Sequence, residues 1–175
     1  MGTQAYEDYL AHKELTLKDK LLKELEAYFG SDKKRIAHAL QVSSYAEELL
    51  KQEGGDWEVV IPASILHDVG IKAAEAKYGS SAGHYQEQEG PAIAQGILLK
   101  LGFMSKRIEE ICAIIGHHHS PGALATKNFA VVCDADWLVN MQDEVDVQDK
   151  ERVAGLIAKV FVTQSAQQIA REKYL

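Results

Sequence analysis

The chain has little of what defines several common protein classes. It contains two cysteines and three prolines in 175 residues. Both cysteines, Cys112 and Cys133, lie among aliphatic residues, which is typical of reduced core cysteines in a cytoplasmic protein and not of a disulfide framework. No segment approaches the roughly 20 apolar residues that span a bilayer, and the stretch from Met1 to Asp8 lacks the basic start and apolar run of a signal peptide. We therefore expect no membrane partner and no secretion.

Positive charge is also scarce. Nineteen Lys and Arg stand against 26 Asp and Glu, which gives a net charge of -7. Such a surface does not attract phosphate backbones in general, so we expect no nucleic acid polymer as a partner, whereas a local cationic pocket still suits a small phosphorylated substrate. The sequence has no Gly-Lys-Ser/Thr phosphate loop and no Gly-x-Ser-x-Gly elbow, which disfavours nucleoside-triphosphate switching and serine hydrolase chemistry. The oligomeric state is left open.

The composition, with 46% apolar and 26% charged residues, is typical of a globular protein. Apolar residues recur at helical spacing and no strand-like alternation persists, so we expect an all-α fold of about six to eight helices in a single domain, residues 1–175. Residues 72–83 show no clear periodicity and are expected to form a mobile loop. The predicted helices span residues 15–29, 32–52, 56–66, 91–101, 105–115 and 127–141, with one or two more in a C-terminal packing region, residues 150–175.

Ionisable side chains interrupt the apolar segments at four places. His38 lies in the stripe of the second predicted helix, and His67 with Asp68 ends the third. Residues 117–119 are three consecutive histidines after an apolar helix, and Asp136 follows an apolar run. Helix interiors rarely accept such groups without partners, so we interpret them as partners of one another through a shared divalent metal.

The order His, His-Asp, Asp resembles the HD-domain superfamily of metal-dependent phosphohydrolases. The resemblance covers about residues 30–142 and is strongest in Ala63-Ser-Ile-Leu-His-Asp-Val-Gly70. It implies a helical bundle of the HD type with one ion at a first site, whose implied ligands are His38, His67, Asp68 and Asp136. A mixed nitrogen and oxygen set suits Mn, Fe, Co, Ni or Zn, and Mg less well.

Two aspartates compete for the last ligand position. Asp134 and Asp136 both share a helix face with apolar residues, so periodicity does not separate them. The resemblance favours Asp136, because the family places its last aspartate directly after a small residue and two before a Leu. Asp134 is then expected to be a supporting group that fixes the imidazoles.

The segment from His84 to Gly90, followed by His117 and His118, resembles family members that bind two metals. The resemblance implies that His84, His117 and His118 hold a second ion. The alternative from the residues alone is a solvated helix end, where histidine interacts favourably with the helix dipole. His119 is expected to be exposed and outside the site.

The resemblance implies a phosphohydrolase in which one or two metal ions activate water against a small phosphoester, such as a nucleotide or dinucleotide. Asp68 is the expected catalytic residue because it is placed to bridge both ions. Lys72 and Arg35 are candidate phosphate contacts. Two alternatives stay open: a two-iron oxygenase with the same kind of ligands, and a non-catalytic sensor.

Overall fold

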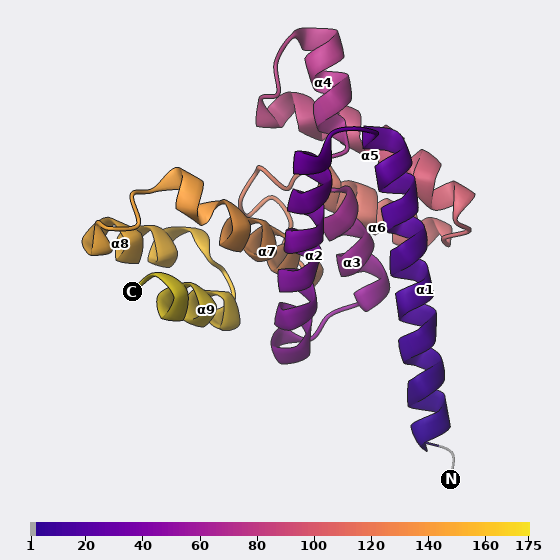
Figure 1. The fold of residues 1–175 in the computed structure, drawn as a ribbon, viewed down its shortest axis with the longest axis horizontal. Coiled ribbons are helices and arrows are strands. Elements are labelled where there is room, and N and C mark those ends of the chain that lie inside the picture. The colour runs from indigo at the N-terminus through magenta and orange to yellow at the C-terminus, as the bar shows by residue number, and fades with distance from the viewer. Residues whose placement is uncertain (1–2) are drawn as a thin grey trace.

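The computed structural model describes residues 3–175 (Figure 1). Met1 and Gly2, which begin the stretch that lacks the features of a signal peptide, lie outside the described residues. The described residues form α-helices and no strand, which confirms the all-α prediction. There are nine helices in this part of the chain, against the six to eight expected: α1 (Thr3–Phe29), α2 (Lys33–Glu53), α3 (Trp57–Leu66), α4 (Gly70–Tyr78), α5 (Gly83–Lys100), α6 (Ser105–Ile115), α7 (Lys127–Glu144), α8 (Lys150–Val160) and α9 (Gln164–Tyr174).

Residues 72–83, predicted as a loop, contain most of α4 and the start of α5. The segment is rich in alanine, which is a strong helix former but gives little hydrophobic contrast, and only Gly70 and Ala74 of α4 are buried. Periodicity therefore missed this helix. Gly79 ends it with a φ of 65°, the left-handed conformation that favours glycine after a helix. α5 also begins earlier than expected and runs through Pro91.

Side chains cap several helices at their first turn. The carboxylate of Asp56 accepts a hydrogen bond from the backbone N–H of Glu58 at the start of α3. Asp32 caps α2 by accepting from Arg35 N–H. These caps fix where α2 and α3 begin, and hence which residues of each helix face the interior.

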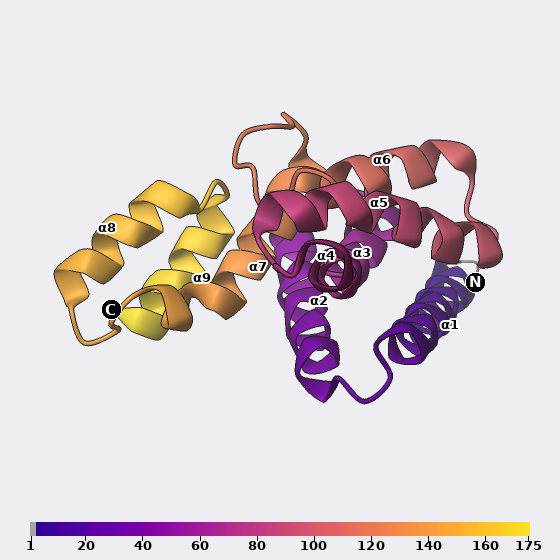
Figure 2. The same cartoon turned by 90° about the horizontal axis from the view of Figure 1, so that it is seen from above.

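Helix α3 is the centre of the bundle. Every residue from Val59 to Leu66 is buried, and α1, α2, α6 and α7 all contact this helix. Figures 1 and 2 show α3 enclosed by these longer helices. Because α3 ends at Leu66, the chain delivers His67 and Asp68 to the interior of the protein.

The last two helices lie on one side of the bundle, beyond α7 (Figures 1 and 2). They pack on each other, and α9 also contacts α2 and α7. Among residues 3–175, no helix combines the length and the apolar character needed to cross a bilayer.

Candidate metal centre

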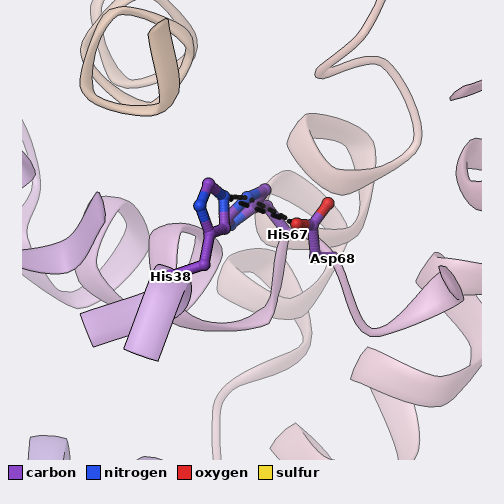
Figure 3. A group of neighbouring side chains, drawn as sticks. All are labelled: His38, His67 and Asp68. Carbon is purple, nitrogen blue, oxygen red and sulfur yellow. Dashed lines mark hydrogen bonds and ion pairs between the residues drawn. The ribbon is translucent and has the colours of Figure 1, made fainter. Parts of the chain in front are cut away.

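Two helices and one turn bring four ionisable side chains together. His38 comes from the first half of α2, Asp136 from the middle of α7, and His67 and Asp68 from the junction of α3 and α4. Figure 3 shows His38, His67 and Asp68 pointing toward one another. We call His38, His67, Asp68 and Asp136 the His38 group.

The donor atoms of this group are spaced as ligands of one ion. Nε2 of His38 lies 3.2 Å from Nε2 of His67 and 3.1 Å from Oδ1 of Asp136. Nε2 of His67 lies 3.3 Å from Oδ2 of Asp68 and 3.4 Å from Oδ1 of Asp136. Donors held about 2.1 Å from one ion lie about 3.0 to 3.4 Å apart in octahedral or tetrahedral geometry. Donor atoms of His38, His67 and Asp68 all lie within 4.8 Å of one another, and Asp136 adjoins both imidazoles, so these residues could hold a divalent metal.

The hydrogen bond on the far side of His67 strengthens this conclusion. Nδ1 of His67 lies 2.7 Å from the backbone oxygen of Ser64 and must donate, because a carbonyl oxygen only accepts. A neutral His67 ring then presents its Nε2 lone pair to two carboxylates, which is unfavourable unless a proton or a cation lies between them.

The pKa values of the group also indicate that a positive charge is favourable among these side chains. Burial opposes a charge on His67, but Asp68 and Asp136 outweigh it and raise the pKa of His67 well above its ordinary value. Burial would raise the pKa of Asp68, yet the neighbouring His67 lowers it well below the ordinary value. The pKa of Asp136 is lowered by His67 and His38 despite its burial. Both carboxylates are thus held ionised in the interior.

A second set of donors meets the other oxygen of Asp68. Nε2 of His118 lies 3.5 Å from Oδ1 of Asp68, and potential ligand atoms of Asp68, His118 and His119 all lie within 4.8 Å of one another. We call these three residues the His118 group. Nδ1 of His118 donates to the backbone oxygen of Ile115, while its buried Nε2 has no hydrogen-bond partner among the described residues. A buried lone pair without a partner, directed at a carboxylate, fits a metal ligand.

Helix α5 holds the turn that carries the two histidines. The side chain of Glu87 accepts hydrogen bonds from His119 N–H and from the Ser120 hydroxyl. Nε2 of His119 lies 3.2 Å from Oε1 of Gln86. A Cβ at Gly83 would lie only 2.9 Å from the ring of His119, so glycine makes room for the imidazole.

The sequence match decides the family. A family model described as the HD domain matches residues 35–141, a range that contains all members of both groups. The chain belongs to the HD domain family. A crystal structure described as a predicted HD superfamily hydrolase, from an uncultured Thermotogales bacterium, is 26% identical. The matched region covers 89% of this chain and 84% of the chain in that crystal structure, with a TM-score of 0.66. None of the curated proteins matches the chain.

Within this HD domain, the two candidates for the last ligand separate cleanly. Oδ1 of Asp136 lies 3.1 Å from Nε2 of His38 and 3.4 Å from Nε2 of His67. Asp134 contacts no imidazole of either group; its carboxylate accepts hydrogen bonds from the backbone N–H groups of Val162 and Thr163 and from the Thr163 hydroxyl. Burial raises the pKa of Asp134 against these bonds. Asp134 therefore anchors α9 to α7 instead of supporting the imidazoles.

The structure does not bring His84 and His117 into either group of the HD domain. His117 is exposed, and its Nδ1 lies 2.8 Å from the backbone oxygen of Ala113. His84 is exposed beside the ring of Tyr85. Because α5 begins at Gly83, the residues that meet His119 are Gly83 and Gln86, three positions apart, and His84 falls off that face.

His119 was expected to be exposed and outside the site, because it leads into the Ser120-Pro121-Gly122 turn. It is exposed, but one of its ring nitrogens lies close enough to Asp68 and His118 to share a metal ion with them. The helix ends at Ile115, and residues 116–119 form turns in which neighbours can point the same way.

The two expected phosphate contacts are engaged elsewhere. The guanidinium of Arg35 pairs with Asp32 at 2.9 Å and with Glu75 at 2.6 Å. Nζ of Lys72 donates to the backbone oxygen of Tyr28 at 3.0 Å and lies over its ring. Both cations tie neighbouring helices together, and a phosphate would have to displace these partners.

Proposed function

We propose that this HD domain is a metal-dependent phosphohydrolase that cleaves a small phosphoester, of the nucleotide or dinucleotide class, with water activated at the metal centre. One observation carries the proposal. Oδ2 of Asp68 faces Nε2 of His67, and Oδ1 of the same carboxylate faces Nε2 of His118. This arrangement suits two cations that share one carboxylate. The hydrolase description of the similar crystal structure supports the reaction class.

The residues of the centre have distinct tasks. A divalent ion, when bound, acidifies water and polarises a phosphoryl oxygen. His38, His67 and Asp136 would hold a first ion, and His118 and His119 a second. Asp68 would be shared by both ions and would orient the attacking water. The water oxygen bonds to phosphorus, the ester P–O bond breaks, and the proton lost by water is returned to the departing alcohol.

The test begins with metal-free protein reloaded separately with Mn, Fe(II), Co, Ni or Zn. Phosphate release from a panel of mononucleotides and dinucleotides is then measured without oxygen. We expect metal-dependent turnover that is lost in Asp68→Ala and kept in His117→Ala, whose imidazole lies outside both groups. Oxygen uptake with substrate and no phosphate release would instead indicate an oxygenase, and metal binding without turnover of any substrate would indicate a sensor.

A further inference from the structure

A largely apolar pocket lies beside the His118 group. Its volume is about 410 Å³, within the roughly 300–1,000 Å³ range of small-molecule sites. The segment between α6 and α7, one face of α7 and the connection between α8 and α9 form its wall. The main apolar residues of this wall are Pro121, Leu124, Phe129, Trp137, Val160 and Val162.

The pocket and the metal centre share a wall. His118 lines the pocket and also directs Nε2 to Asp68. Its backbone oxygen accepts a hydrogen bond from Sγ of Cys133, which lines the pocket too. A molecule in the pocket would therefore lie next to the place where the second ion and the reacting phosphoryl group are expected.

The order of side chains around α7 explains this position. Successive residues of an α-helix are about 100° apart, so Cys133 lies about 60° from Asp136, and Trp137 and Ala130 follow on the same side. All three line the pocket. Asp134, which anchors α9, comes next around the helix. The pocket thus occupies the sector of α7 between the metal ligand and the anchor.

Most polar side chains on the wall are already engaged by the protein. The hydroxyl of Thr126 accepts from Phe129 N–H, and the hydroxyl of Thr163 donates to Asp134. The carboxylate of Glu53 accepts from Ser165 N–H. Lys127 also lines the pocket; apart from its ammonium group, the wall offers apolar surface but few free partners for the polar edge of a ligand.

We propose that this pocket binds the organic group of the phosphoester and selects groups that carry a neutral ring, such as a nucleobase. Selection is by buried apolar area and not by the hydrogen-bonding edge of the ring. The inference rests on the proposed phosphohydrolase function for the catalytic step, but the binding of the ring is separable from it.

Two substrate pairs test the selection. Adenosine 5′-monophosphate and ribose 5-phosphate have the same ester and differ by the base. We expect kcat/KM to be about 30-fold higher for the nucleotide, because the base removes apolar area from water. Cytidine and uridine monophosphates have rings of similar size with reversed donors and acceptors. They should differ by less than about threefold, whereas a site built to read the ring edge discriminates by orders of magnitude.

Ala130→Phe is the pocket-filling variant. Its matched control is Ala158→Phe, at an exposed position of α8 that does not line the pocket. Ala130→Phe should lower kcat/KM for adenosine monophosphate about tenfold and leave ribose 5-phosphate unchanged. The control should change neither. Equal loss on both substrates, or equal rates of the wild-type protein on them, overturns the proposal while leaving the phosphohydrolase function intact.

Binding of adenosine, which carries no phosphate, decides the proposal without turnover. The chain has two tryptophans, so Trp57→Phe leaves Trp137 as the only one. Adenosine should quench its fluorescence, and Ala130→Phe in that background should abolish the quenching. Quenching without hydrolysis of any phosphoester would support the pocket and defeat the proposed function. No quenching at millimolar adenosine, with the protein folded by circular dichroism, would overturn the pocket proposal.

Discussion

Oδ1 of Asp68 lies 3.5 Å from the buried Nε2 of His118, while Oδ2 of the same carboxylate faces His67 at 3.3 Å. Asp68 is thus the only residue common to the two groups that can hold a metal among residues 3–175. The arrangement makes the number of bound ions, and the residues that set it, directly testable.

Replacing His118 or His119 by Ala should lower the metal content from about two ions to about one, because each change removes a donor from one group only. Asp68→Ala should reduce both sites. His117→Ala is the matched control, since it removes the neighbouring exposed imidazole. Elemental analysis after reconstitution with excess metal measures the ratio. A drop with His117→Ala, or none with His119→Ala, would restore the ligand set first expected from the sequence.

Replacing the two aspartates of α7 should have different effects on the protein. Asp136→Ala should lower metal occupancy at the His38 group. Asp134→Ala should keep the metal but lower the free energy of unfolding by about 2 to 4 kcal/mol, because three donors of Val162 and Thr163 lose their acceptor. Metal analysis and denaturant unfolding of both variants separate these effects. Equal metal loss in the two would contradict the assignment of Asp136 as the ligand.

Gly70 should tolerate no side chain. A Cβ at this position would lie 2.3 Å from the backbone oxygen of Gln86 and 2.8 Å from the nitrogen of Gly90. Backbone on both sides cannot yield easily, so Gly70→Ala should cost about 3 kcal/mol of stability. Gly96→Ala, in open space on α5, should instead stabilise by about 0.5 to 1 kcal/mol. Urea midpoints compare them, and equal effects would argue against close packing of α4 on α5.

Glu53 should give α9 a pH-dependent stabilisation. A hydrogen bond from Ser165 lowers the pKa of Glu53. A folded-state pKa below the unfolded value means that the contribution is present above the unfolded pKa and is lost as the pH falls through the folded one. Glu53→Gln should therefore cost about 0.5 kcal/mol at pH 7, and the difference should shrink near pH 3. Unfolding at both pH values tests this, with exposed Glu48→Gln as the control for losing one charge. A constant difference would contradict it.

The resemblance of the order of histidines and aspartates to the HD family predicted the members of the His38 group. His67 and Asp68 directly follow α3, in which every residue from Val59 to Leu66 is buried. For such segments burial follows from composition, and buried ionisable groups must find one another.

The remaining candidate residues lie where the pattern within one helix constrains them less. Helical spacing applies only as far as Ile115, where α6 ends, so it does not settle how His117 and His119 lie relative to Asp68. Arg35 and Lys72 found Glu75 and Tyr28, 40 and 44 residues away in the chain. Partners of surface cations depend on how helices are juxtaposed, which the spacing within one helix does not contain.

One stretch of α5 packs against segments that carry residues of both groups. Gln86 and Gly90 set how closely the start of α4 approaches, directly after Asp68. Gln86 and Glu87 hold the turn of His119. A shift of α5 along its axis would therefore move the start of α4, next to Asp68, and the turn of His119 together relative to α2 and α7.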